Sequence, residues 1–243
     1  MRRREKWRED PVKWAAWMGC LGFCLLSAGG FFWKGQVLEG LICLGTLALV
    51  TLPPALEACC RWKLRRGFFV FCLFYALGPM LGKAYRLYYL THWWDKLLHT
   101  SAGFVFGVLG ICLCRALNHG KETSLALEVV FGICFSVAVS AVWELVEFGV
   151  DRCFGADMQN DTVVYAIHSY LLGDAPGVLG SITDIGQVHV DGTPLGVAGY
   201  LDIGLIDTMQ DVLVETVGAV VYGAYHGCNG GNKPLVQMVN TGK

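Results

Sequence analysis

The sequence is poor in charged residues. Asp, Glu, Lys and Arg make up 16% of its 243 residues, whereas about 25% is usual for soluble domains. A soluble globule needs a charged surface, so this shortage excludes one, and the apolar composition excludes disorder and a nucleic-acid module as well. The net charge of −1 gives no electrostatic reason to expect an anionic partner.

The sequence also lacks a visible disulfide framework. It holds 11 cysteines, an odd number, and most of them lie inside apolar runs, where cysteine acts as a small hydrophobic residue. What the sequence has in excess is apolar side chains, which make up 54% of it. This composition predicts an integral membrane protein whose first partner is the lipid bilayer.

Six apolar stretches come close to the ~20 residues that span ~30 Å of hydrocarbon. They cover residues 14–33, 37–56, 67–82, 97–117, 125–150 and 206–225. The third is short and is expected to continue through Lys83 and Arg86, whose long stems can snorkel. We therefore expect an all-α, polytopic membrane helix bundle with about six transmembrane helices, forming a single integral membrane domain over residues 1–243.

Lys and Arg are distributed unevenly between alternate loops. If the N-terminus is cytoplasmic, the cytoplasmic side holds 14 of them and the outer side 5. The 14 comprise six in residues 1–13, four in residues 61–66, and Arg115, Lys121, Lys233 and Lys243. The positive-inside rule therefore predicts six spans with cytoplasmic N- and C-termini.

One long connection, residues 151–204, falls on the outer side and is expected to form a small extracytoplasmic cap over the bundle. Asp161 or Thr162 could cap a short interfacial helix that presents Val163, Ile167, Tyr170 and Leu171 on one face. Further along, residues 188–193 alternate around Asp191-Gly192, which predicts a tight hairpin.

Polar side chains form stripes on three of the expected spans, because residues at i, i+3, i+4 and i+7 share a helix face. The stripes are Asp95, His99, Gly103 and Gly107; Ser136, Ser140, Glu144, Glu147 and Asp151; and Asp207, Asp211, Glu215 and Gly218. Some of these residues could instead have purely structural roles. Asp95 and Asp207 could be helix N-caps, Asp151 a solvated loop residue, and His99 a hydrogen-bonded histidine at the membrane interface. Glu144 and Glu147 are harder to explain this way, because a carboxylate at membrane depth is costly.

If the stripes converge, their carboxylates cannot all ionise without a cation or shared protons. Oxygen-rich sets suit Mg²⁺, Mn²⁺ or Ca²⁺, and a histidine among carboxylates also suits Zn²⁺. The candidate ligands of a divalent cation are Asp95, His99, Glu144, Glu147, Asp207 and Asp211. His99 and Glu144 are also the candidate general bases if the site is catalytic.

Four ordered motifs carry a resemblance to a known family. They are Trp94-Asp95-Lys96-x-x-His99, the run from Trp143 to Phe148, the run from Phe154 to Gln159, and the run from Gly199 to Asp211. Over roughly residues 67 to 226 the sequence resembles the YjdF-like bacterial membrane proteins, which are distantly similar to VanZ-like proteins. The resemblance implies a bacterial cytoplasmic membrane protein whose Asp-x-x-x-His, Glu-x-x-Glu and Asp-x-x-x-Asp elements are the residues just named as candidate ligands.

Three functions are consistent with such a site. We expect it to bind a cation, a lipid headgroup or an envelope ligand on the outer face. The alternative is a metal-dependent membrane enzyme acting on a lipid or lipid-linked substrate. A proton-coupled transporter ranks third, because the first three spans carry no counterpart of the acidic stripes that an inverted repeat would need.

Overall fold

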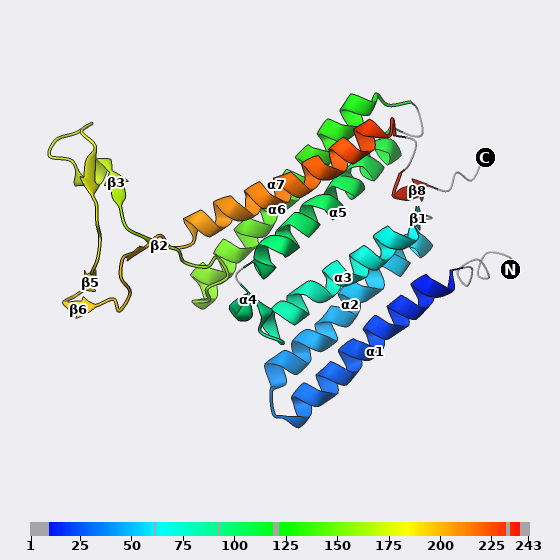
Figure 1. Cartoon of the computed structure of the whole chain (residues 1–243), viewed down its shortest axis with the longest axis horizontal. Coiled ribbons are helices and arrows are strands. Elements are labelled where there is room, and N and C mark those ends of the chain that lie inside the picture. Colours follow the sequence, from blue (N-terminus) through cyan, green and yellow to red (C-terminus); the bar gives the residue numbers. More distant parts are fainter. Residues whose placement is uncertain (1–9, 61, 92, 119–121, 232–233, 239–243) are drawn as a thin grey trace. The chain divides into compact units, whose positions relative to one another are not determined.

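The computed structural model describes the chain except for residues 1–9, 61, 92, 119–121, 232–233 and 239–243. The charged N-terminal segment and Arg61, Lys121, Lys233 and Lys243, which enter the loop-charge prediction, lie outside the described residues. Within the described part, long helices dominate (Figure 1). They are α1 Pro11–Trp33, α2 Val37–Cys59, α3 Arg66–Lys83, α5 Trp94–Leu117, α6 Leu125–Phe154 and α7 Leu205–Cys228, with a short α4 at Leu87–Leu90.

The helical architecture is confirmed, because each predicted span falls on one long helix, but short strand pairs depart from the predicted all-α class. Within the described part of the chain, four of these helices, α1, α2, α5 and α6, are long and apolar enough to cross a membrane. The other two stay predicted crossings. Helix α7 is less apolar than the other four because its first half carries Asp207, Asp211 and Glu215.

Local sequence explains how α1 begins and how it turns into α2. The side chain of Asp10 accepts hydrogen bonds from the backbone N–H groups of Val12 and Lys13, and Pro11 occupies the first helical turn, where a missing N–H costs nothing. The helix ends at Trp33 with Lys34 as its C-cap residue, and Gly35 then adopts a φ of 72°, a left-handed conformation that glycine takes at no steric cost. The chain thus reverses within a few residues.

The chain divides into two compact units: residues 1–139 with 214–243, and residues 140–213. In the first unit α1, α2 and α3 pack against one another and α3 also packs against α5 (Figure 1). Strand β1 (Trp62–Leu64) pairs antiparallel with β8 (Val236–Met238). The core of this unit includes Phe68, Leu73, Met80, Val108 and Tyr222.

The second unit contains the predicted outer loop, which forms short antiparallel strand pairs. They are β2 (Val163–Val164) with β7 (Tyr200–Leu201), β3 (Ile167–Ser169) with β4 (Gly180–Ile182), and β5 (His189–Val190) with β6 (Thr193–Pro194). The predicted hairpin is confirmed: Asp191 and Gly192 form its turn with φ values of 49° and 79°, as a two-residue hairpin turn requires.

The predicted interfacial helix is wrong. Val163 and Ile167 lie in strands, and the 3₁₀ turn η2 (Tyr170–Leu172) follows them. β-branched residues favour extended backbone, and a single helical turn is too short to be stable by itself. Strand pairing satisfies the backbone groups instead.

Candidate metal centre

The first turn of α5 is anchored by a tryptophan. Trp94 is buried, and its indole Nε1 donates a hydrogen bond to the carbonyl of Gly78 in α3 at 3.2 Å. Trp93 occupies the N-cap position, so Asp95 lies inside the first turn and the N-cap reading of Asp95 is wrong. This placement puts Asp95 and His99 four residues apart on one face of α5.

His99 lies between two carboxylates. Its Nε2 is 3.8 Å from Oδ1 of Asp95, and its Nδ1 is 3.8 Å from Oε2 of Glu215 on α7. Both His99 and Glu215 are buried, with 8% and 2% of their surface exposed. The imidazole therefore has a negative charge facing each ring nitrogen in a largely water-free setting.

A serine on α6 completes this group. The hydroxyl of Ser136 is fully buried and lies 3.3 Å from the carbonyl oxygen of Gly103 and 3.4 Å from Oε1 of Glu215. Three helices thus hold Glu215 in place. Glu215 belongs to a predicted polar stripe but not to the predicted ligands, although it continues the spacing of four after Asp211.

Small residues bring these helices close enough for the contacts. A Cβ added to Gly103 would collide with the backbone carbonyl of Glu215, and one added to Gly218 would collide with the carbonyl of Thr100. A Cβ on Gly132 would come within 2.9 Å of the carbonyl oxygen of Gly107. The glycines of the polar stripes therefore lie at helix interfaces, where small residues allow close backbone approach.

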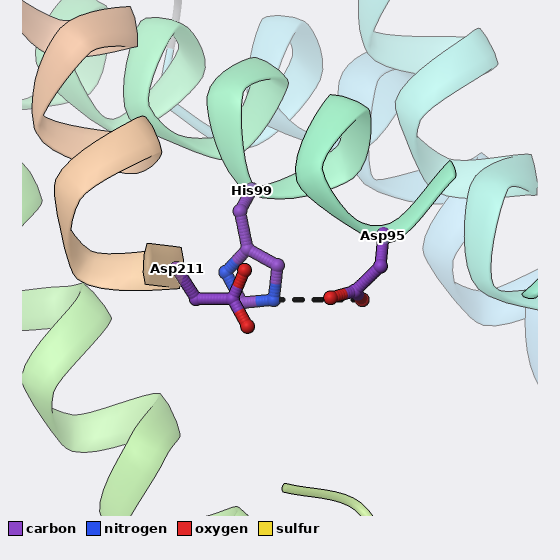
Figure 2. Close-up of side chains that lie close together, drawn as sticks. All are labelled: Asp95, His99 and Asp211. Atoms are coloured by element: carbon purple, nitrogen blue, oxygen red, sulfur yellow. Dashed lines mark ion pairs between the residues drawn. The ribbon is translucent and has the colours of Figure 1, made fainter. Parts of the chain in front are cut away.

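Asp211 lies one helical turn before Glu215, because α7 is a continuous helix through both residues. Figure 2 shows Asp211 with Asp95 and His99, and one ligand atom from each of the three lies within 4.8 Å of the other two. The figure also marks the Asp95–His99 ion pair. On its other side, Asp95 forms an ion pair with Lys96 at 3.4 Å. Two carboxylates and an imidazole form a set that could hold a metal ion.

The other predicted ligands are buried in the second unit. Glu144 is 6% exposed and Glu147 is 8% exposed, and Glu147 accepts a hydrogen bond from the indole of Trp143 at 2.8 Å. Asp207 accepts hydrogen bonds from the backbone and side chain of Asn160 at 3.1 and 3.2 Å. Asp207 therefore anchors the loop, and because α7 begins at Leu205, Asp207 lies inside the first turn and the N-cap reading of Asp207 is wrong. That Glu144, Glu147 and Asp207 belong to the same metal site stays a prediction.

Two further aspartates organise the loop around the ends of α6 and α7. Asp151 lies in the last turn of α6 and accepts hydrogen bonds from the backbone N–H groups of Met158 and Gln159 at 2.7 and 2.9 Å. The reading of Asp151 as a solvated loop residue is therefore wrong. Asp202 accepts a hydrogen bond from the N–H of Ile206 at 2.6 Å, which stabilises the start of α7.

Burial raises the pKa of Asp161, and the nearby carboxylates of Asp157, Asp202 and Asp151 raise it further. A cluster of negative charge therefore surrounds Asp161 in the second unit, and none of its carboxylates belongs to the candidate ligands.

A second buried polar cluster, not predicted from the sequence, lies in the first unit. Arg115 of α5 forms a bidentate ion pair with Glu128 of α6, with both N–O distances 2.7 Å. Glu128 also accepts a hydrogen bond from Thr123 at 2.6 Å and lies 2.8 Å from Nε2 of His226 on α7. Opposite charges at the facing ends of consecutive predicted helices, Arg115 and Glu128, were the available indication.

The fold and this site define a helical membrane protein with polar clusters between its helices. The family model for predicted membrane proteins named DUF2238 matches residues 15–228, and the chain belongs to that family. The resemblance to YjdF-like proteins agrees with this membership, while the more distant VanZ similarity stays a prediction. No curated protein and no solved structure matches the sequence.

Proposed function

We propose that the protein binds a divalent cation through Asp95, His99 and Asp211. The observation that carries the proposal is the placement of an imidazole nitrogen and two carboxylate oxygens within 4.8 Å of one another at buried or half-buried positions. Ligand atoms at ~2.0–2.2 Å from one ion lie about 3 to 4 Å apart. Small side-chain rotations would therefore bring the three groups onto one ion.

Glu215 supports the role of His99 as a ligand. Metal-binding histidines usually present one ring nitrogen to the ion and hold the other against a carboxylate, which fixes the orientation of the ring. In this protein Nδ1 of His99 faces Glu215 at 3.8 Å, while Nε2 faces the Asp95 side. Glu215 is then the positioning residue, and Nε2 is the nitrogen that meets the cation.

Charge balance also favours a cation. Asp95, Asp211 and Glu215 bring three negative charges when ionised. Lys96 and a protonated His99 would supply two positive charges. With a neutral His99, the form that binds metals, only the positive charge of Lys96 remains. Like-charged carboxylates at this depth destabilise one another unless a cation or a proton intervenes. Three protein ligands also leave positions on the ion for a phosphate-bearing headgroup, which would make the site a receptor for a lipid or envelope ligand.

The cation is tested on protein purified in detergent without added metal. Elemental analysis should find one Mg²⁺, Mn²⁺, Ca²⁺ or Zn²⁺ per chain, and His99→Gln and Asp211→Asn should lose it. Saturating the metal-free protein with that ion should raise its Tm by roughly 5 to 10 °C at a hundredfold excess over Kd, since the ion binds only the folded state.

The matched control is Asp174→Asn, which neutralises an exposed carboxylate in the second unit and should keep the metal. The sign of the change in stability distinguishes the two possibilities. With a bound ion, Asp211→Asn removes a ligand and lowers the Tm; without one, it relieves repulsion and raises the Tm or leaves it unchanged. A wild-type protein that is metal-free and insensitive to all four ions would overturn the proposal.

We also propose that all six long helices cross the membrane, with both termini cytoplasmic and the 151–204 loop outside, in the cytoplasmic membrane of a bacterium. The 14-to-5 distribution of Lys and Arg supports this orientation. The resemblance to YjdF-like proteins supports the bacterial location. The distant VanZ similarity supports a role in the cell envelope.

A further inference from the structure

The first unit contains a cavity of about 470 Å³ between α3, α5 and α7. This volume falls in the ~300–1,000 Å³ range of pockets that bind small ligands. Phe68 and Phe71 of α3, Phe104 of α5 and Val221 of α7 form much of its wall. Gly67 and Gly218 also line it, and their missing side chains leave the space open.

Almost nothing in the wall can hydrogen-bond a ligand. Thr100 lines the cavity, but its hydroxyl already donates to the carbonyl of Lys96 at 2.7 Å, inside its own helix. Ser101 is the other hydroxyl in the wall. A cavity of this kind does not hold water, which needs two to four polar partners, and it therefore suits an apolar occupant.

The cavity reaches the outside of the helices. Gly67 is exposed and Val221 is 55% exposed, whereas Phe68 and Ser101 are buried. Since α5 is apolar enough to cross a membrane, this opening faces hydrocarbon when the helix spans the bilayer. The apolar molecules present there are lipid acyl chains.

A basic residue, Arg65, lies at one end of the cavity, and a second, Lys63, comes two residues before it. The backbone N–H of Arg65 donates to the carbonyl of Leu235, a wall residue, at 2.7 Å, and its guanidinium lies 3.5 Å from the hydroxyl of Tyr225, one turn beyond Val221. Lys63 precedes it on β1 and is also exposed. Nearby charges are already balanced, since Arg66 pairs with Asp10 at 3.0 Å and Lys13 with Glu57 at 2.7 Å.

Within the described chain, Lys63 and Arg65 form no ion pair, so an external anion can neutralise them. Basic residues beside a membrane helix attract anionic lipids by about 1 kcal/mol each. We propose that the cavity binds an acyl chain of an anionic phospholipid and that Lys63 and Arg65 bind its headgroup. This site uses none of the candidate metal ligands.

The experiment is photo-crosslinking in lipid vesicles that contain phosphatidylglycerol with a diazirine in one acyl chain, followed by mapping of the labelled peptides. Label should concentrate on residues 67–71, 100–104 and 218–221. Gly67→Leu should remove most of it, because a Cβ at position 67 meets no atom within 4 Å and the new side chain can occupy the cavity without a clash.

The matched control is Gly45→Leu on α2, another exposed glycine whose Cβ would meet no atom within 4 Å, and it should label like the wild type. Arg65→Gln should lower labelling by phosphatidylglycerol about fivefold and leave labelling by the phosphatidylcholine analogue unchanged. Label spread evenly over the lipid-facing helices, or equal labelling of Gly67→Leu and wild type, would overturn the proposal. Unchanged Arg65→Gln labelling would overturn the headgroup assignment.

Discussion

At the scale of single residues, the buried charged groups form two clusters that differ in the distances between their charges. Glu128 is 4% exposed. Side-chain nitrogen or oxygen atoms of Arg115, Thr123 and His226 all lie within 2.8 Å of its carboxylate oxygens. In the Asp95–His99–Glu215 group, by contrast, each ring nitrogen of His99 lies 3.8 Å from a carboxylate oxygen. A close, fully paired cluster stabilises helix packing, whereas the looser one leaves space for an ion.

The residue-scale prediction concerns Glu128→Gln. Removing one partner of a buried ion pair leaves the other charge poorly compensated and costs about 3 kcal/mol, at the low end of the range because the Arg115 side chain is 30% exposed. The Tm in detergent should therefore fall by several degrees. The control is Glu122→Gln, an exposed carboxylate just before α6, which should change the Tm little. Equal effects of the two variants would show that the cluster adds no stability.

At the scale of elements, the crossing of α5 and α7 decides the geometry of the metal centre. Gly103 and Gly218 allow the two backbones to touch, and the contact lies one turn from His99 on α5 and close to Glu215 on α7. In a membrane, close backbone approach replaces the hydrophobic effect as the source of helix association. The glycines therefore position the imidazole against Glu215.

Gly103→Leu tests this crossing. The new side chain would collide with the backbone of Glu215, which cannot yield as a flexible side chain does, so overpacking should cost about 1 to 3 kcal/mol. A lower Tm should be accompanied by loss of the bound metal, because α7 moves away from His99. Gly22→Leu on α1, where an added Cβ meets no atom within 4 Å, serves as the matched control. An unchanged Tm and metal content in Gly103→Leu would mean that this face does not hold the site.

Particular elements show what the sequence could and could not predict. The stripe of Asp95, His99 and Gly103 was readable because helical spacing places these residues on one face whatever the tertiary structure. The pairing of the helices could not be predicted, because close backbone approach decides which polar stripes face each other. Glu215 was therefore not among the predicted ligands. Val163 and Ile167 fit a helical face equally well, but strand partners far along the chain at residues 182 and 201 decided their conformation.

At the scale of the whole molecule, the number of crossings decides which ends share a side of the membrane. Among the described residues, four helices are long and apolar enough for a span, and α3 and α7 would bring the number to six. With four crossings, the ends of α2, α6 and α7 all lie on the same side. With six, the end of α6 lies opposite the ends of α2 and α7.

Labelling of the native cysteines distinguishes these two topologies, so no cysteine has to be introduced by mutation. Cys59 and Cys60 lie at the end of α2, Cys153 at the end of α6 and Cys228 at the end of α7, and all four are exposed. A membrane-impermeant maleimide applied to intact cells should label Cys153 alone among them, and the other three should react only after permeabilisation; Cys153→Ser confirms the assignment. Protection of all four would indicate four crossings. Labelling of Cys59, Cys60 and Cys228 with Cys153 protected would reverse the orientation and move the metal centre to the cytoplasmic end of the helices.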